Sequence, residues 1–211
     1  MTLQGASIDH VTSVVEDPTE ARRHLVDAYG IGSERSSYLT YAGARSWIAP
    51  LLPPSYLELL SVEDESVAET SAVGRQLLDR CRGGGGLVAW SILVGDLPAV
   101  SRRLGISIFD YTKEDDDGSL RGWRSVSGPA YLPFFIEYAG ADARMVRLQE
   151  VYQRVGHRCA PSVFSQLTIS CSKSELAEWI GPHNLPLRSV SGSDGLVEAR
   201  ISTADGEVVV R

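Results

Sequence analysis

Two stretches of the sequence share one pattern: Ile8-Asp-His-Val-Thr-Ser-Val-Val15, followed by Asp17-Pro18, and Leu87-Val-Ala-Trp-Ser-Ile-Leu-Val94, followed by Asp96-Leu-Pro98. Each run is rich in β-branched and apolar residues, which is typical of a strand. Each is followed by an aspartate suited to cap a helix and by a proline suited to its first turn. The spacing from His10 to Asp17 equals that from Ala89 to Asp96. We therefore predict an internally repeated strand–helix unit.

Three more strand-like runs follow each of these helices, so each unit has the order βαβββ. In the first unit the helix ends at Gly30 and the runs cover 37–42, 45–49 and 56–62. In the second unit they cover 106–111, 122–127 and 133–138, with an acidic, turn-rich hairpin loop at 114–118. The last strands match when Tyr56-Leu-Glu58 is laid over Phe135-Ile-Glu137. A helix over 69–82 and a run of glycines at 83–86 join the two units.

The chain divides into three parts on this pattern. Residues 1–140 hold the paired units, 8–62 and 87–138, and residues 141–164 form a linker with a helix over 141–156. Residues 165–211 form a partial third unit, packed on the first two, with strands over 165–171, 187–190, 196–202 and 207–210.

Composition narrows the class of protein. Hydrophobic residues make up 43% and charged residues 22%, which is ordinary for a globular chain. A net charge of −7 without a basic block argues against nucleic-acid or anionic-membrane partners. No run approaches the roughly 18 apolar residues of a membrane span, and the first residues do not resemble a signal peptide, so we expect a cytoplasmic protein. The cysteines (Cys81, Cys159 and Cys171) lack CxxC spacing, which favours reduced thiols.

Several short motifs occur in a characteristic order: Ile-Asp-His-Val at 8–11, Arg45-Ser-Trp47 before Tyr56-Leu-Glu-Leu-Leu60, an Asp-Gly loop before Gly122-Trp-Arg124, and Pro133-Phe-Phe-Ile-Glu137. Together they resemble the glyoxalase-like family of the vicinal-oxygen-chelate superfamily, which also includes bleomycin-resistance proteins and extradiol dioxygenases. The resemblance implies an α+β fold in which repeated βαβββ modules curl mixed sheets around a cavity, with a shortened third module. It also implies a small-molecule substrate or ligand, and it is compatible with a homodimer.

His10, Glu58 and Glu137 are polar groups within apolar strands, and a buried carboxylate needs a cation, a metal or a proton. The resemblance places these three at metal-ligand positions, with Glu58 and Glu137 also as catalytic residues. The fourth position is Ala89, which cannot ligate. One divalent ion (Zn, Ni, Fe, Co or Mn) suits imidazole and carboxylate donors. The alternative is a site without metal, in which these groups bind one another or an organic ligand.

Seven further side chains are candidates for substrate binding. Arg45 and Arg124 lie in strands, where an inward guanidinium needs an anion, either a substrate carboxylate or one of the two glutamates. Trp47 and Trp123 each either line the pocket or pack in the core. The full set is Arg45, Trp47, Tyr56, Trp123, Arg124, Phe135 and, from the linker that precedes the third unit, His157.

Two functions from different classes remain open. One is a small-molecule enzyme of isomerase, lyase or dioxygenase type, whose metal would polarise vicinal oxygens of the substrate. Glyoxalase I activity itself is not expected, because the four-ligand set is incomplete. The other is a metal-free protein that binds or sequesters an apolar or aromatic compound. Fold alone does not choose between them.

Overall fold

The computed structural model describes residues 5–114 and 120–211. Most of the predicted acidic loop, 114–118, lies outside these ranges. The first unit contains β1 (Ser7–Val14), α1 (Pro18–Tyr29), β2 (Glu34–Leu39), β3 (Ala44–Pro50) and β4 (Tyr56–Val62). The second contains β5 (Gly86–Leu93), α4 (Leu97–Leu104), β6 (Phe109–Glu114), β7 (Leu120–Val126) and β8 (Phe134–Tyr138). The repeated βαβββ order is thus present in both halves.

The two equivalent helices begin and end as the sequence pattern predicts. The carboxylate of Asp17 accepts hydrogen bonds from the first-turn amides of α1, and Asp96 does the same for α4. Gly30 and Gly105 follow the two helices with φ of 68°, a left-handed conformation that glycine adopts without steric cost. The predicted helix over 69–82 is α3 (Ala72–Arg82), which begins later because Ser71 caps its start, and a short unpredicted helix, α2 (Glu65–Ala68), precedes it.

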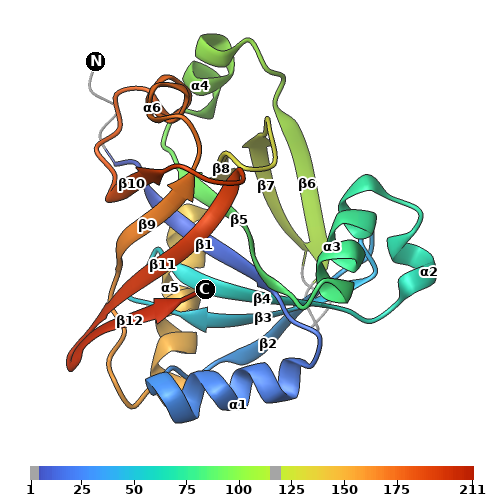
Figure 1. The fold of residues 1–211 in the computed structure, drawn as a ribbon, viewed down its shortest axis with the longest axis vertical. Coiled ribbons are helices and arrows are strands. Elements are labelled where there is room, and N and C mark those ends of the chain that lie inside the picture. The colour runs from blue at the N-terminus through green and yellow to red at the C-terminus, as the bar shows by residue number, and fades with distance from the viewer. Residues whose placement is uncertain (1–4, 115–119) are drawn as a thin grey trace.

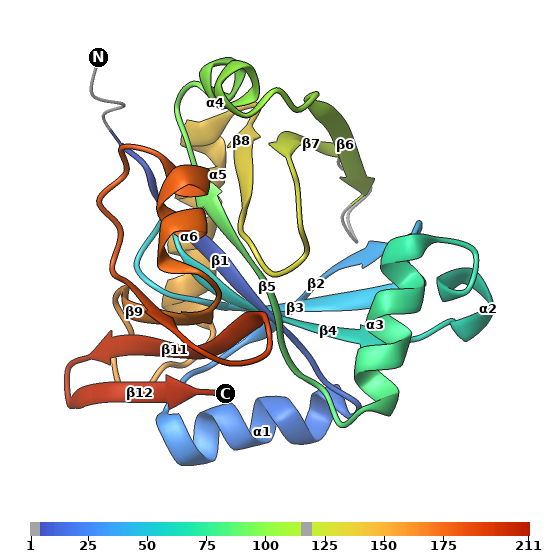
Figure 2. The same ribbon diagram turned by 45° about the horizontal axis from the view of Figure 1, so that its top comes forward.

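The first eight strands form one strongly curled sheet in the order β2-β3-β4-β1-β5-β8-β7-β6. Figure 2 shows β2–β4 and β6–β8 as two arms that meet at the central pair β1 and β5. This pair is antiparallel, with His10 opposite Ser91 and Thr12 opposite Ala89. Such reciprocal pairing relates the two modules by a pseudo-twofold axis and makes Ala89 the equivalent of His10. The predicted equivalence of these two strands is confirmed.

The arms approach each other again at the far ends of the sheet, where β2 lies near β6. Side chains make the junction: Arg121 donates a hydrogen bond to Ser37 Oγ at 3.2 Å, and the rings of Tyr41 and Tyr111 lie 6.4 Å apart. We call this line of side-chain contacts the seam. Within the described strands, β2 and β6 are the two ends of the sheet order, so no ladder of backbone hydrogen bonds joins them.

The C-terminal part follows helix α5 (Ala141–Arg154) and contains β9 (Phe164–Ser170), α6 (Lys173–Ile180), β10 (Leu187–Val190), β11 (Gly195–Thr203) and β12 (Gly206–Val210). Its four strands form a second sheet, β10-β9-β11-β12, which lies over β1 and β5 in Figure 1. Trp90 and Ile92 of β5 are buried in one core cluster with Leu167 and Ile201 of this sheet. The convex side of the curled sheet therefore packs in the hydrophobic core, and a cavity can form only on the concave side.

The third unit is anchored to the second module through α6. The indole Nε1 of Trp179 donates a hydrogen bond to the Pro133 carbonyl at 2.8 Å. A Cβ atom on Gly128 would lie 2.1 Å from the same indole ring, so only glycine fits beneath it. No helix in the described ranges is long and apolar enough to cross a membrane.

Candidate active site

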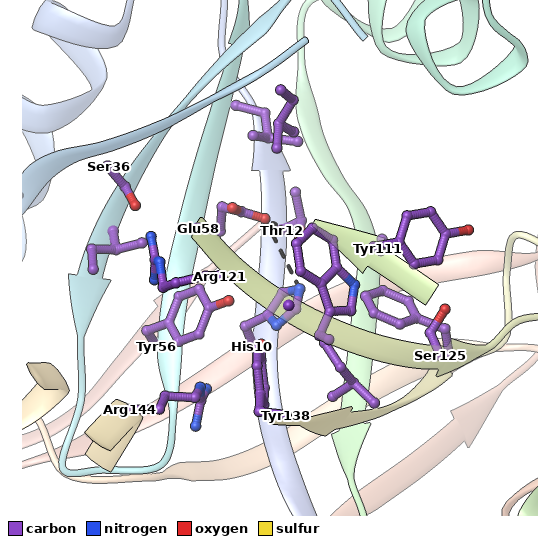
Figure 3. Close-up of a pocket in the computed structure, with 18 of the residues that line it drawn as sticks. His10, Thr12, Ser36, Tyr56, Glu58, Tyr111, Arg121, Ser125, Tyr138 and Arg144 are labelled. Atoms are coloured by element: carbon purple, nitrogen blue, oxygen red, sulfur yellow. Dashed lines mark hydrogen bonds and ion pairs between the residues drawn. The ribbon is translucent and has the colours of Figure 1, made fainter. Parts of the chain in front are cut away.

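A cavity of about 590 Å³ occupies the concave side of the curled sheet, a size typical of small-molecule sites. Its walls come from β1, β4, β5 and β8 in the centre, β2, β3, β6 and β7 in the arms, and helices α3 and α5 at the ends. Ala89 lines it, as predicted from the repeat, and so do His10 and Glu58. Figure 3 shows His10 and Glu58 facing each other from neighbouring strands.

His10 is oriented by the residue that precedes it. The pairing of β1 with β5 shifts register between Ile8 and His10, so Asp9 is an extra residue in β1. Such a β-bulge turns a side chain away from strict alternation. As a result Asp9 Oδ2 lies 2.7 Å from His10 Nδ1, and Ser91 Oγ lies 2.9 Å from the same nitrogen. Both Asp9 and Ser91 are fully buried.

The pairing with Asp9 fixes the tautomer of His10. An ionised carboxylate only accepts hydrogen bonds, so Nδ1 of His10 donates to Asp9 and the proton-free nitrogen of the neutral ring is Nε2. This Nε2 lies 4.0 Å from Glu58 Oε2 (Figure 3). The His10 ring stacks on Tyr56 at 4.8 Å and meets the edge of Phe134 at 5.4 Å. The imidazole is therefore held in one orientation with a basic nitrogen at the cavity wall.

Glu58 is held by two hydroxyl groups from neighbouring strands. Ser46 Oγ donates to Oε1 at 2.7 Å, and Thr12 Oγ1 donates to Oε2 at 3.2 Å. Glu58 is 8% exposed, so these two hydrogen bonds replace most of those that its carboxylate would otherwise make with water. The two hydroxyl groups therefore hold the Glu58 side chain in one position beside His10 Nε2.

Asp9 also connects the site to α5. Tyr138 donates its hydroxyl to Asp9 Oδ2 at 3.0 Å, and Arg144 Nη2 donates to Oδ1 at 2.5 Å. The Arg144 guanidinium lies 4.1 Å from the centre of the Tyr138 ring. Burial, and then the charge of Asp9, raise the pKa of both Tyr138 and Tyr56. Both phenols thus keep their protons and can act as hydrogen-bond donors.

Aromatic and apolar groups form much of the remaining wall. Tyr111 and Trp123 stack at 5.4 Å with an interplanar angle of 11°. Tyr41 lines the cavity beside them, and burial, with the charge of Glu58 second, raises its pKa to about 12. Leu39, Ile48, Leu60 and Ile136 are among the aliphatic members of the lining. The cavity accordingly suits an apolar body with one polar end.

Several predicted site residues lie elsewhere. Arg124 and Glu137 form an ion pair with each other, and Glu137 Oε1 accepts from the amide of Leu97 at the start of α4. The expectation that Glu137 joins His10 and Glu58 is therefore wrong. The register explains the error: Thr12 pairs with Glu58 in the first module, and its equivalent Ser91 pairs with Phe134. Phe134, not Glu137, occupies the position equivalent to Glu58.

The other misplaced residues follow from strand alternation. Arg45 pairs with Glu63 and lies over Tyr38, while Trp47 packs in the core on the face opposite Ser46. Phe135 is fully buried in the same core cluster, so its neighbour Phe134 lines the cavity instead. Of the residues predicted to bind substrate, Tyr56 and Trp123 line the cavity.

His157 is likewise outside the cavity. Its Nδ1 accepts a hydrogen bond from the Gly32 amide at 3.1 Å. Burial lowers its pKa from 6.5 to about 4, which keeps the ring neutral. His157, a predicted substrate-binding residue, is therefore not part of the cavity wall and instead joins the segment after α5 to the first module.

Similarity to known proteins agrees with this architecture. The curled eight-stranded sheet with paired βαβββ modules is the fold of the vicinal-oxygen-chelate superfamily. A family model described as a glyoxalase-like domain matches residues 8–181, and the chain belongs to that family.

Two solved structures illustrate the likeness. A hypothetical protein from Staphylococcus aureus is 15% identical with a TM-score of 0.67, over 91% of this chain and 88% of that one. Methylmalonyl-CoA epimerase from Mycobacterium tuberculosis is 22% identical with a TM-score of 0.48, over 65% of this chain and 91% of that one. None of the curated proteins compared with the chain matches it. At 15% identity, the likeness to the Staphylococcus aureus protein concerns the fold alone.

The residues present do not suit the divalent metal that many members of the superfamily bind. By register the four ligand positions are His10, Glu58, Ala89 and Phe134, and the last two have no lone pair to donate. Both oxygens of Glu58 already accept hydrogen bonds. In the described ranges no three His, Cys, Asp or Glu side chains are grouped to hold an ion. The predicted ligand set of His10, Glu58 and Glu137 therefore does not assemble.

Proposed function

We propose that the protein is a small-molecule enzyme that moves a proton on an apolar carbonyl compound, with His10 as the base. The observation that carries this proposal is the bond between Asp9 Oδ2 and His10 Nδ1, which leaves Nε2 as the proton acceptor at the cavity wall. A buried carboxylate that orients an imidazole is the arrangement that general-base catalysis uses.

The side chains around His10 can stabilise both of the charges that such a proton transfer creates. When Nε2 takes a proton from the carbon next to a carbonyl group, the resulting imidazolium lies between two carboxylates, Asp9 and Glu58. The substrate oxygen gains negative charge at the same time. The phenol of Tyr56, which burial keeps protonated, lines the same cavity and is a suitable donor to that oxygen. Isomerase and lyase reactions both begin with this step.

Solvent exchange of an enolisable ketone tests the proposal directly. The probe is 2-tetralone, a bicyclic apolar ketone, incubated with the protein in D₂O while ¹H NMR follows loss of its α-proton signals. We expect exchange above the buffer rate, reduced roughly 100-fold or more in His10→Gln, in keeping with the usual contribution of a general base. His24→Gln is the matched control, because His24 lies on the exposed face of α1 and contacts Tyr29. Exchange no faster than buffer, or equal in His10→Gln, would overturn the proposal.

A second function is favoured by the wall of stacked aromatic rings. Tyr111 and Trp123 offer a flat surface to an aromatic ligand, and Ala89 and Phe134 leave the catalytic positions of the second module blank. A binding or sequestration protein would show tight association with apolar aromatic compounds and no exchange or turnover. Quenching of Trp123 fluorescence, compared with Trp123→Phe, measures that association.

A further inference from the structure

Ser125 brings a hydroxyl group without a partner to the cavity wall. The residue is 3% exposed and lies in β7, two positions after Trp123, and both side chains line the cavity. Within the described part of the chain, nothing forms a hydrogen bond with Ser125 Oγ. The atom is not enclosed by protein either, unlike the unbonded Ser170 Oγ. The hydroxyl group therefore faces the cavity, on the side of His10 away from Tyr56 (Figure 3).

The pseudo-twofold axis explains why Ser125 has no partner. Ser46 and Ser125 are equivalent by register, because each pairs with the residue two places after the matched residues Glu58 and Phe134. In the first module Ser46 Oγ donates to Glu58 Oε1 at 2.7 Å. In the second module the phenyl ring of Phe134 offers no oxygen to accept such a bond. Ser125 is therefore the hydroxyl half of a pair whose carboxylate half is absent.

The hydroxyl group of Ser125 can discriminate between ligands. An apolar ligand that covers it would leave the hydroxyl without a hydrogen bond, which is unfavourable. A ligand with an oxygen atom at this point avoids that penalty. A hydroxyl group both donates and accepts, so it suits a neutral hydroxyl or carbonyl oxygen. A site that makes such a bond separates ligands with and without the oxygen better than an apolar pocket does.

We propose that Ser125 is a specificity-determining residue that forms a hydrogen bond with a neutral oxygen substituent of the ligand. The ligand class is then an apolar aromatic compound with a hydroxyl or keto group, in addition to its polar end at His10. Because Trp123 and Ser125 are two residues apart on one strand face, a ring that lies against Trp123 has its neighbouring substituents within reach of Ser125. The inference rests on the proposed function only in treating this ligand as the substrate.

Equilibrium dialysis with two probes of the same shape tests this inference. 2-Naphthol and 2-methylnaphthalene differ only in a hydroxyl group in place of a methyl group. The quantity compared is the ratio of their affinities, because the methyl compound is the more hydrophobic one for every variant. We expect Ser125→Ala to shift this ratio toward 2-methylnaphthalene by roughly three- to tenfold, the usual contribution of one neutral hydrogen bond. Ser127→Ala is the matched control and should leave the ratio unchanged, because Ser127 is exposed and its hydroxyl group stays in contact with water.

A stability measurement separates ligand binding from a structural role. Ser125→Ala removes a hydroxyl group that bonds to nothing in the described residues, so the urea midpoint should not fall. Ser46→Ala removes the equivalent hydroxyl group, which is bonded to Glu58, so its midpoint should fall. A midpoint that falls in Ser125→Ala would show that the hydroxyl group already has a structural partner and would contradict the inference. Ser125→Cys, whose thiol is only a weak donor, should shift the affinity ratio in the same direction as Ser125→Ala.

Four binding results would overturn the inference: no binding of 2-naphthol by wild type, an unchanged ratio in Ser125→Ala, an equal shift in Ser127→Ala, or an equal shift in His10→Gln. The last result would place the hydroxyl group of the probe at His10. Dialysis needs no turnover, so the predicted shift in Ser125→Ala can be observed even if proton exchange fails. Proton exchange together with an unchanged ratio would contradict this inference alone.

Discussion

Asp9 and His10 are adjacent in sequence, yet their side chains meet, with Asp9 Oδ2 2.7 Å from His10 Nδ1. In a regular strand neighbouring side chains point to opposite faces. The bulge in β1 removes that separation and allows Asp9 to bind His10, Tyr138 and Arg144 at once. Asp9, the one extra residue of β1 in this pairing, therefore both orients His10 and links it to α5 through Arg144.

The first prediction concerns the buried ion pair of Asp9 and Arg144. Asp9→Asn should lower the free energy of unfolding by roughly 3–5 kcal/mol, because it leaves the mostly buried charge of Arg144 unpaired. Asp9→Asn/Arg144→Gln should lose less than the sum of the two single variants. Urea unfolding at pH 7 measures all three. Glu137→Gln, which breaks the more exposed pair with Arg124, should cost no more than about 1 kcal/mol. Additive losses at Asp9 and Arg144 would contradict their coupling.

The second prediction concerns the two blank ligand positions. Ala89→His should create measurable affinity for Zn²⁺ or Ni²⁺, and Ala89→His/Phe134→Glu should strengthen it at least about tenfold, because each change adds a donor facing His10 and Glu58. Calorimetric titration against wild type measures the gain. The control is Ala89→His/Glu137→Gln, which should bind as Ala89→His does. If this control bound the metal less tightly than Ala89→His, Glu137 would be a metal ligand after all, and the prediction would be wrong.

The third prediction concerns pH and His157. Burial lowers the pKa of His157 from 6.5 to about 4, so the folded state binds this proton less readily than the unfolded state. Its contribution to stability is therefore full above about pH 6.5 and is lost as the pH falls toward 4. At pH 4.5 the loss amounts to about 2 kcal/mol after allowance for partial exposure.

Chemical denaturation of His157→Gln measures this effect. The variant should be less stable than wild type at neutral pH, because the bond from the Gly32 amide is altered. The difference should narrow by roughly 2 kcal/mol at pH 4.5. A difference that stays constant with pH would show that His157 titrates alike in both states. His24→Gln serves as the comparison on the exposed side of α1.

The fourth prediction concerns the contact between α6 and the second module. Gly128→Ala should destabilise the protein by about 1–3 kcal/mol, because a Cβ atom would lie 2.1 Å from the indole of Trp179. Gly95→Ala is the control, since a Cβ atom there meets nothing within 4 Å. Thermal unfolding of both variants makes the comparison. Equal midpoints would show that Trp179 moves aside without penalty.

Sequence patterning was sufficient for the architecture and for half of the site. Repeated caps at Asp17 and Asp96 identified the two modules, and their spacing correctly placed Ala89 in the cavity wall. Alternation also grouped Tyr56 with Glu58 correctly. In β8 alternation separated Phe134 from Phe135, but it does not say which face is core. Choosing the face of Glu137 was the error, and only the register of β5 with β8 corrects it.

Asp9 and Arg144 were missed for two physical reasons. A bulge depends on how two strands pair, so no period in one strand reveals that Asp9 turns toward His10. Arg144 belongs to a helix between modules, and its place in the cavity wall depends on tertiary docking of α5. A signal was available in hindsight: Asp9 is a charged residue inside an apolar strand and required a cation from elsewhere in the chain.

At the seam, two neighbouring strands of the curled sheet are held together by side chains and not by a backbone ladder in the described residues. Elsewhere around the curled sheet, separating two strands breaks backbone hydrogen bonds between them. Between β2 and β6 only side-chain contacts in the described residues have to part, such as the bond from Arg121 to Ser37 and the contact of Tyr41 with Tyr111. Side chains change rotamer far faster than strands unpair. Parting the seam in the described residues therefore needs only a rearrangement of side chains, which leaves both modules and the bulge that orients His10 intact.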